Sequence, residues 1–264
     1  MGKVHSGITL KARHLGAQLF YSSPMANEKH EDRMGRWARS GKTGAPPVHA
    51  ATVIPIRDSD KGIEVLMLRR NSKIAFGGMW VFPGGRVDPA DTDGEEANGE
   101  QASARRAAVR EAQEEAGLDL DLEALLPYSH WTPPPITPKR FLTWFFLAAA
   151  PAGEIVIDGG EIHEHAWMRP QDALERRDAG EIEIAPPTWV TLHELSVHQT
   201  TREALETTES REPERFETRI AMEVDGPTAM WKGDSGWPEG DAESPGSRHR
   251  LRMHGESWSY ERSQ

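Results

Sequence analysis

Three glutamates lie close together in the segment Arg110-Glu111-Ala112-Gln113-Glu114-Glu115-Ala116-Gly117-Leu118. On a helix, Glu111, Glu114 and Glu115 are spaced i, i+3 and i+4, so their side chains share one face. Like charges at this spacing repel, and each pair destabilises the helix by roughly 0.2–0.5 kcal/mol. A bound Mg²⁺ or Mn²⁺ would relieve that repulsion, because hard cations prefer carboxylate oxygen. The spacing therefore predicts a divalent-metal site.

The residues around these glutamates support the same chemistry. Arg110 is next to Glu111 and four residues before Glu114, so it can pair with a carboxylate and fix its orientation. A turn, Phe82-Pro83-Gly84-Gly85, precedes the helix, and glycine allows backbone dihedral angles and close approaches that other residues resist. Together the turn and the helix indicate a metal ion held against a phosphate.

The composition of the chain excludes several other classes of protein. Among 264 residues the net charge is −11, which argues against broad affinity for nucleic acid. The absence of cysteine excludes a disulfide framework, a thiol nucleophile and cysteine-ligated zinc. The apolar run 141–150 is too short to span a bilayer. We therefore expect a cytoplasmic protein that neither binds nucleic acid nor associates with a membrane.

Changes in composition along the chain predict three regions. Residues 1–47 are polar and end in Gly44-Ala45-Pro46-Pro47, so we expect a flexible N-terminal leader. Residues 48–209 have the pattern of a globular domain. Residues 210–264 are charged and broken by Gly and Pro clusters, which predicts a C-terminal extension of short strands with a mobile loop at 233–247. This extension is also a candidate homodimer contact.

Within these regions, hydrophobic patterning predicts strands and helices of an α/β layered fold. Strands are expected at 50–56, 63–70, 79–82, 122–130, 141–149 and 162–168. Helices are expected at 102–116, 170–177 and 188–207. In the extension, short strands are expected at 218–224, 228–231, 248–254 and 258–260.

The cluster resembles the signature of the Nudix hydrolase superfamily. That signature, the Nudix box, reads Gly, five residues, Glu, seven residues, then Arg-Glu-U-x-Glu-Glu-x-Gly-U, where U is aliphatic. Its second half matches residues 110–118, but six residues after Gly85 stands Asp91 in place of Glu. An acidic stretch at 91–101 interrupts the box before the helix. Asp91, Glu100 or no residue fills the place of the early carboxylate.

The resemblance extends over about residues 48–205 and implies a Nudix-type α/β/α sandwich with a mixed β-sheet. The segments 65–70, 80–91, 131–133 and 185–188 look like the acyl-coenzyme A diphosphatase-like branch, whose box is interrupted. Coenzyme A enzymes of a related branch carry an arginine four residues before the glycine matching Gly78. This chain has Ile74 there, so the resemblance implies diphosphate cleavage more strongly than coenzyme A specificity.

The resemblance also implies roles for individual residues. Glu111, Glu114 and Glu115, with the backbone carbonyl of Gly85, would hold Mg²⁺ or Mn²⁺. Arg110 would orient the glutamates, and the backbone of Gly84 and Gly85 would let the diphosphate approach closely. The reaction would be hydrolysis of a nucleoside diphosphate derivative to a nucleotide and a phosphorylated product.

Residues outside the box complete the predicted site. Family members often use a carboxylate on a loop before a late strand, and here Glu161, Glu164 or Glu111 could be the general base; we assign Glu164 to the catalytic set. Arg140 could bind phosphate and Trp131 could stack on a base, although a core tryptophan beside a strand end is an equally good interpretation. Arg69 and Arg70 alternate faces, and we expect Arg70 to reach the cleft.

Two functions fit this pattern. The first is a metal-dependent diphosphatase acting on coenzyme A or its acyl esters, NADH, ADP-ribose or a dinucleoside polyphosphate. The alternative is a nucleotide-sensing Nudix module that binds without significant catalysis. All three glutamates are present, which favours the enzyme.

Overall fold

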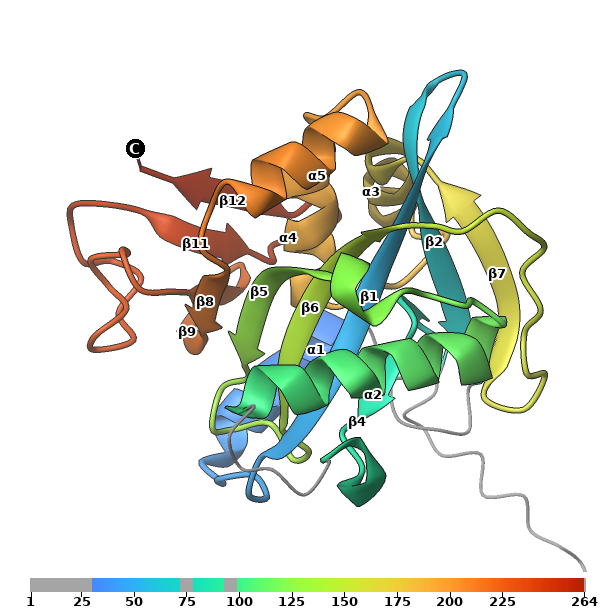
Figure 1. The fold of residues 1–264 in the computed structure, drawn as a ribbon. Coiled ribbons are helices and arrows are strands. Elements are labelled where there is room, and N and C mark those ends of the chain that lie inside the picture. The colour runs from blue at the N-terminus through green and yellow to red at the C-terminus, as the bar shows by residue number, and fades with distance from the viewer. Residues whose placement is uncertain (1–29, 72–77, 93–98, 264) are drawn as a thin grey trace, which may run out of the picture.

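The computed structural model describes residues 30–71, 78–92 and 99–263 (Figure 1). Ile74, part of the acidic stretch 91–101 and most of the predicted leader lie outside these residues. The described residues contain one large mixed sheet and a smaller antiparallel sheet, both of which are visible in Figure 1.

The large sheet carries the predicted domain. Its strands are β1 (Val48–Ser59), β2 (Gly62–Arg70), β3 (Trp80–Val81), β4 (Gly84–Arg86), β5 (Leu126–Thr132), β6 (Phe141–Ala149), β7 (Ile162–Met168) and β8 (Glu214–Glu217). The order is β3-β2-β1-β6-β5-β8, with β4 paired to β1 and β7 paired to β2. β1 runs parallel to β6 and antiparallel to β2, so the sheet is mixed, as predicted.

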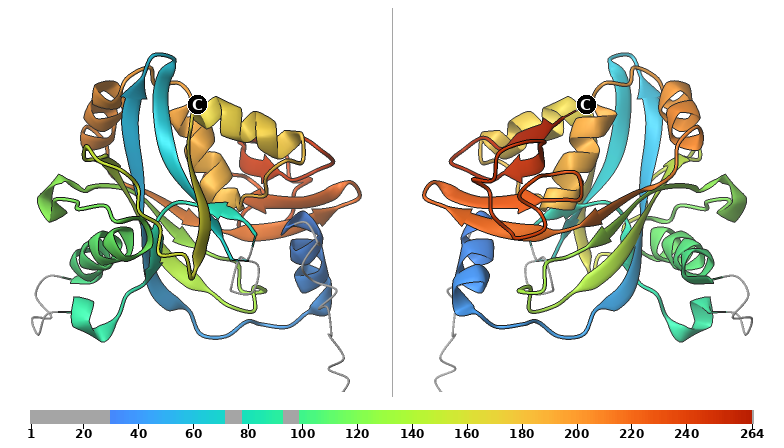
Figure 2. Two further views of the ribbon diagram at one scale, coloured as in Figure 1. Left: turned by 90° about the vertical axis from the view of Figure 1, so that its right-hand side faces the viewer. Right: turned by 90° about the vertical axis from the view of Figure 1, so that its left-hand side faces the viewer.

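Alternating side chains divide the sheet between two cores. Ala51 and Val53 of β1 pack toward the alanines of helix α2 (Gly99–Ala116), while Ile54 and Ile56 pack into the core on the other face. Helices α3 (Pro170–Asp178) and α4 (Pro186–Leu195) contribute to that second core. Figure 2 shows α2 on one side of the sheet and α3 and α4 on the other. The expected α/β/α sandwich with a mixed sheet is therefore present.

Two of the expected elements were wrong in detail. The strand expected at 122–130 begins as a 3₁₀ turn, η3 (Leu122–Ala124), capped by the Asp121 carboxylate, and only then becomes β5. The single helix expected at 188–207 is two helices, α4 and α5 (Thr201–Glu209). The Thr200 hydroxyl accepts the Glu203 backbone N–H and begins the second helix, a local cap that hydrophobic periodicity does not reveal.

The chain on either side of the domain is more ordered than the sequence suggested. Residues 30–40 of the expected leader form helix α1 (His30–Ser40). The extension forms the predicted short strands β9 (Arg219–Glu223), β10 (Gly226–Met230), β11 (His249–Arg252) and β12 (Ser259–Arg262), ordered β12-β11-β10-β9. β8 falls within the expected extension but pairs with β5 in the large sheet.

The loop at 233–247, expected to be mobile, is held in place. Arg250 on β11 is fully buried and binds both oxygens of Asp234, at 2.7 and 2.6 Å. The same guanidinium donates to the carbonyl of Ala242, farther along the loop. One buried arginine thus fixes two points of the loop. Among the described residues, no helix is both long and apolar enough to cross a membrane.

Candidate active site

Arg110 and Asp91 join the two halves of the interrupted box. The Arg110 guanidinium donates to Asp91 at 3.1 and 3.0 Å and to the carbonyl of Arg86 at 2.9 Å. Burial would raise the pKa of Asp91, but hydrogen bonds from Arg110 and the Asp88 backbone outweigh it and hold that pKa below its usual value. Asp91, and not Glu100, is therefore the acidic residue of the interrupting stretch that contacts Arg110.

Arg110 also contacts two glutamates of the predicted metal face. Its Nη1 lies 3.0 Å from Oε1 of Glu111 and 3.0 Å from Oε2 of Glu114. The Glu111 side chain is 16% exposed and its pKa is raised, mainly by burial, whereas the Glu114 side chain is 58% exposed. Arg110 thus contacts one sheltered and one accessible carboxylate, and its role in orienting them stays a prediction.

Glu115 is the most buried carboxylate of the face. Its Oε2 accepts the backbone N–H of Gly84 at 2.9 Å, across 31 positions of sequence. Burial raises its pKa to about 7; the hydrogen bond from Gly84 and the charge of Arg70 oppose that rise, while the charges of Glu111 and Glu161 add to it. Burial and the neighbouring carboxylates therefore bring the pKa of Glu115 close to neutral pH.

The glycine turn fits against the helix because its residues lack side chains. Gly84 and Gly85 belong to β4, which pairs with Thr52 and Ala51 of β1. A Cβ on Gly85 would overlap the carboxylate of Glu111, and a Cβ on Gly84 would collide with the carbonyl oxygen of Ala51. Glycine thus allows the turn to approach β1 closely at position 84 and the Glu111 carboxylate closely at position 85.

A second arginine approaches the cluster from β2. Arg70 lies 2.7 Å from Glu161 and 3.9 Å from Glu115, with 17% of its side chain exposed. The expectation that Arg70 reaches the site agrees with these contacts. Glu161, immediately before β7, lies near enough for its charge to raise the pKa of both Glu111 and Glu115.

Glu164 occupies a different place. It pairs with Arg69 across β2 and β7, at 3.2 Å, and both side chains are about half exposed. Arg69 shares a strand face with Met67, which packs in the core opposite α2. The structure therefore places Glu161, not Glu164, beside the glutamates of α2. A register shift between Arg69 and Arg70 separates the Arg69–Glu164 pair from the Arg70–Glu161 pair.

Trp131 and Arg140 also lie elsewhere. Trp131 is buried, stacks on Phe216 with ring centroids 3.9 Å apart, and donates its indole N–H to Ser129. It belongs to the core opposite α2, so the interpretation as a core tryptophan was the right one. Arg140 donates to the carbonyl of Pro133, in the Pro-rich loop between β5 and β6. Neither makes a described contact with the carboxylates of α2.

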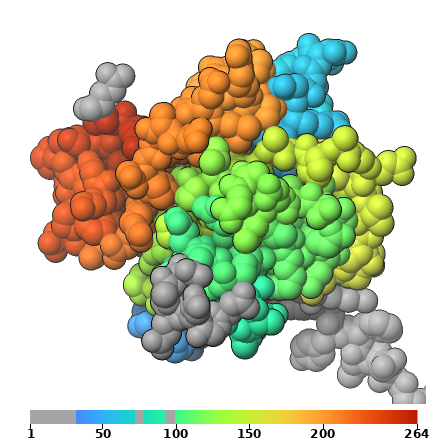
Figure 3. Space-filling model, in the orientation of Figure 1, coloured from blue at the N-terminus to red at the C-terminus, as the bar shows by residue number. Residues whose placement is uncertain are grey.

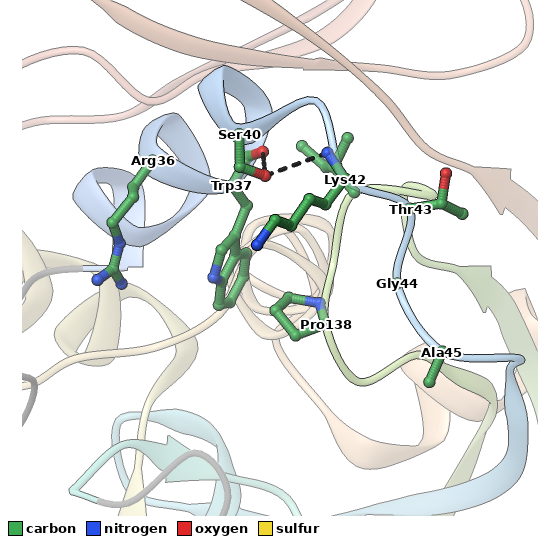
Figure 4. A pocket seen from close by; sticks show the side chains of 9 residues that line it. Arg36, Trp37, Ser40, Lys42, Thr43, Gly44, Ala45 and Pro138 are labelled. Atoms are coloured by element: carbon green, nitrogen blue, oxygen red, sulfur yellow. Dashed lines mark hydrogen bonds between the residues drawn. The ribbon is translucent and has the colours of Figure 1, made fainter.

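A hollow of about 450 Å³ lies beside that Pro-rich loop, at the end of α1 (Figure 4). The side chain of Lys42 extends toward the indole of Trp37, and the ring of Pro138 lies nearby. It is lined by Arg36, Trp37, Ser40, Lys42, Thr43, Gly44, Ala45, Ile136 and Pro138. None of these is a carboxylate, so the hollow is separate from the predicted metal site.

Glu100 has a role that the sequence did not reveal. Its Oε1 lies 3.2 Å from His130, 3.1 Å from the indole nitrogen of Trp144 and 3.4 Å from His49. These contacts tie the first turn of α2 to β1, β5 and β6. The acidic stretch thus ends in an anchor for the helix that carries the glutamates.

The oxygen donors suit a hard divalent cation, although the described residues do not converge into a ready-made cage of three ligands. Burial and neighbouring negative charges raise the pKa of Glu115 to about 7. The Glu111 carboxylate lies in the space that a Cβ on Gly85 would need. Carboxylate and carbonyl oxygens are the ligands that Mg²⁺ and Mn²⁺ prefer. The residues present therefore fit such an ion. Figure 3 shows the surface of α2 adjoining the segment that leads into β7, the source of Glu161.

Comparison with known proteins identifies the family. Residues 46–188, more than half of the chain, match the model of the NUDIX domain. This chain belongs to the Nudix family. Nudix proteins are hydrolases of phosphorus-containing acid anhydrides, and the chain is an enzyme of this kind. Among curated proteins, no relative matches it.

Several solved structures are similar to this chain, and the first of them has the same fold. A Nudix hydrolase from Alicyclobacillus acidocaldarius is 26% identical with a TM-score of 0.57, covering 64% of this chain and 99% of its own. The Nudix domain of NrtR from Shewanella oneidensis, solved with ADP ribose, is 14% identical with a TM-score of 0.46, covering 65% and 97%. A C. elegans Ap4A hydrolase, solved as a binary complex, is 24% identical with a TM-score of 0.39, covering 57% of this chain and 96% of its own.

Proposed function

We propose that this Nudix protein is a diphosphatase that uses Mg²⁺ or Mn²⁺ to hydrolyse a nucleoside diphosphate derivative. The observation that supports it most is the contact between the glycine turn and α2. The Gly84 N–H binds Glu115, and Gly85 lies against Glu111 where no side chain fits. This contact places the glycine backbone directly against two carboxylates of α2, and carboxylate oxygen is the ligand that a hard divalent cation prefers.

In this proposal the ligands are Glu111, Glu114, Glu115 and the carbonyl of Gly85. When bound, the ion neutralises phosphate charge and lowers the pKa of the attacking water. Arg110 keeps Glu111 and Glu114 directed at the ion because its guanidinium is itself fixed by Asp91. Glu161 is close enough to serve as a base, and Arg70 beside it can meet a substrate phosphate.

The substrate class follows from the chemistry of the site and from the resemblance. A diphosphate that links a nucleoside to a second group can contact both the cation and Arg70. Coenzyme A and its acyl esters, NADH, ADP-ribose and dinucleoside polyphosphates are the members to test. The acyl-coenzyme A diphosphatase-like branch, cytoplasmic location and homodimer formation stay predictions.

The first experiment measures product release from this panel with Mg²⁺, with Mn²⁺ and with chelator. We expect cleavage of at least one compound with metal and none with chelator. Binding of a nucleotide without cleavage, by folded protein with metal, would instead support the nucleotide-sensing module.

The second experiment separates the two candidate bases. Glu161→Gln should reduce turnover roughly a hundredfold, since a general base contributes about 10²–10⁴-fold. Glu164→Gln, its matched control three residues farther along the chain on β7, should stay within about twofold, because Glu164 pairs with Arg69 away from α2. Equal losses in both variants would contradict the assignment of Glu161.

A further inference from the structure

Helix α1 precedes the region that matches the Nudix model, yet it reaches the segment entering the glycine turn. Nη2 of Arg33 donates to Oε1 of Glu183 at 2.5 Å and lies 3.6 Å from Sδ of Met79. The Arg33 side chain is only 17% exposed. The first turns of α1 are therefore packed into the domain rather than lying loosely on it.

The two partners of Arg33 are linked to each other. Met79 is fully buried, and the next residue, Trp80, donates its backbone N–H to the carbonyl of Glu183 at 2.8 Å. Glu183 thus binds Arg33 through its side chain and β3 through its backbone. Four residues after Trp80, the N–H of Gly84 meets Glu115. Arg33 therefore holds the start of a short segment whose end lies in the active site.

The opposite side of α1 is supported by the C-terminal sheet. α1 packs against β9 and β10, and Met34 is buried. At Gly35, a Cβ would lie 3.3 Å from Cε of Met222 on β9, so glycine allows the helix and strand to approach closely. Both views of Figure 2 show α1 beneath these strands. The helix is thus braced between the small sheet and the entry to the glycine turn.

We propose that Arg33 is a positioning residue for the Nudix site. By holding Met79 and Glu183, it fixes the path of residues 79–85 so that the Gly84 N–H faces Glu115. Part-buried, charge-assisted contacts of this kind restrict a segment more than exposed ion pairs do. The catalytic consequence rests on the proposed function, while the positioning itself can be measured without substrate.

The test that needs no substrate is amide hydrogen exchange, resolved by residue, in the full-length protein. In Arg33→Met we expect the amides of Trp80 and Gly84 to exchange about tenfold faster. Glu183→Gln, which keeps the backbone bond to Trp80, should give a smaller acceleration of the same two amides. The matched control, Arg39→Met at an exposed position of the same helix, should leave them unchanged, and so should Ala229 on β10 in every variant.

Turnover supplies the second measurement. With a substrate from the panel, Arg33→Met should lower kcat about five- to tenfold with little change in KM, and Arg33→Lys should recover part of the loss. Wild-type exchange at Trp80 and Gly84 in Arg33→Met would overturn the inference, as would equal acceleration at Ala229. If the wild-type protein cleaves nothing, the proposed function fails while the exchange result still decides the role of Arg33.

Discussion

Two buried carboxylates in this protein have pKa values that are shifted in opposite directions. Asp234, in the C-terminal extension, receives two hydrogen bonds from Arg250 and backbone N–H groups from His249 and Gly236. Burial would raise its pKa, but these bonds prevail and hold it at about 2. Glu115 is also buried, yet its pKa rises to about 7, since its bond to Gly84 and the charge of Arg70, 3.9 Å away, do not compensate for burial.

The difference separates a structural charge from a functional one. Asp234 has its full set of partners within the chain and pins a loop. Glu115 is surrounded by further carboxylates and is left short of positive charge. Carboxylates with perturbed pKa values gather at functional sites, and in our proposal the ligand of this cluster is the cation. The following experiments test this comparison, from the largest expected effect to the smallest.

Replacing the carboxylates of the proposed metal face should strongly reduce turnover without unfolding the protein. We expect Glu115→Gln and Glu114→Gln to reduce turnover by roughly a thousandfold, because each removes a proposed metal ligand. Metal-free Glu115→Gln should be at least as stable as the wild type, since a buried charge has been removed. Turnover assays with urea unfolding in chelator measure both effects. Wild-type turnover in both variants would remove the proposed metal role.

Breaking the structural pair should have the reverse result. Arg250→Met leaves Asp234 charged and buried, and we expect a loss of about 3–5 kcal/mol in the free energy of unfolding. Metal affinity at α2 should be unchanged while the protein is folded. Urea unfolding and Mn²⁺ titration measure the two quantities, and Lys232→Met, at an exposed position nearby, is the control. A large stability loss in the control would contradict a specific role for the pair.

The pH dependence of stability should separate the two groups. The folded-state pKa of Glu115 is raised, so its contribution is complete below about pH 4.5 and is lost as pH rises through 7, up to about 3 kcal/mol. The pKa of Asp234 is depressed, so its contribution is present above 3.8 and is lost as pH falls toward 2.

These opposite slopes can be measured by urea unfolding of the chelated protein between pH 3 and 8. Glu115→Gln should flatten the decline between pH 5 and 8, and Asp234→Asn should flatten the decline on the acid side. Mg²⁺ should also flatten the decline toward pH 8, because it stabilises the charged form of Glu115. A decline that persists unchanged in Glu115→Gln would assign it to other groups.

The smallest expected effect concerns the interrupted box. Asp91→Asn should reduce turnover about tenfold, because Arg110 would lose the charge that fixes it while keeping its contacts with Glu111 and Glu114. Glu100→Gln, in the same acidic stretch, should change turnover less than twofold and act mainly on stability. Steady-state kinetics of both variants provide the measurement, and the reverse ranking would return the early carboxylate to Glu100.

The sequence by itself determined the face of α2 and the turn opposite it. Glu111, Glu114 and Glu115 share a face because the geometry of a helix requires it, and Arg110 reaches two of them for the same local reason. Strand alternation and the mixed α/β pattern likewise depend on short-range periodicity, so the fold class was predictable. Glycine at 84 and 85 was recognisable because only a residue without a side chain suits a close approach.

Tertiary structure decided which distant residues join that face. Asp91 rather than Glu100 meets Arg110, because the 3₁₀ turn at Pro89–Asp91 and the start of α2 direct them differently. Glu161 rather than Glu164 lies beside Glu115, because a register shift between β2 and β7 changes which residues share a side. Tertiary packing also places Trp131 in the core and brings α1 against the segment that enters the glycine turn. Such contacts depend on how strands pair and pack, and residue spacing along the chain does not encode them locally.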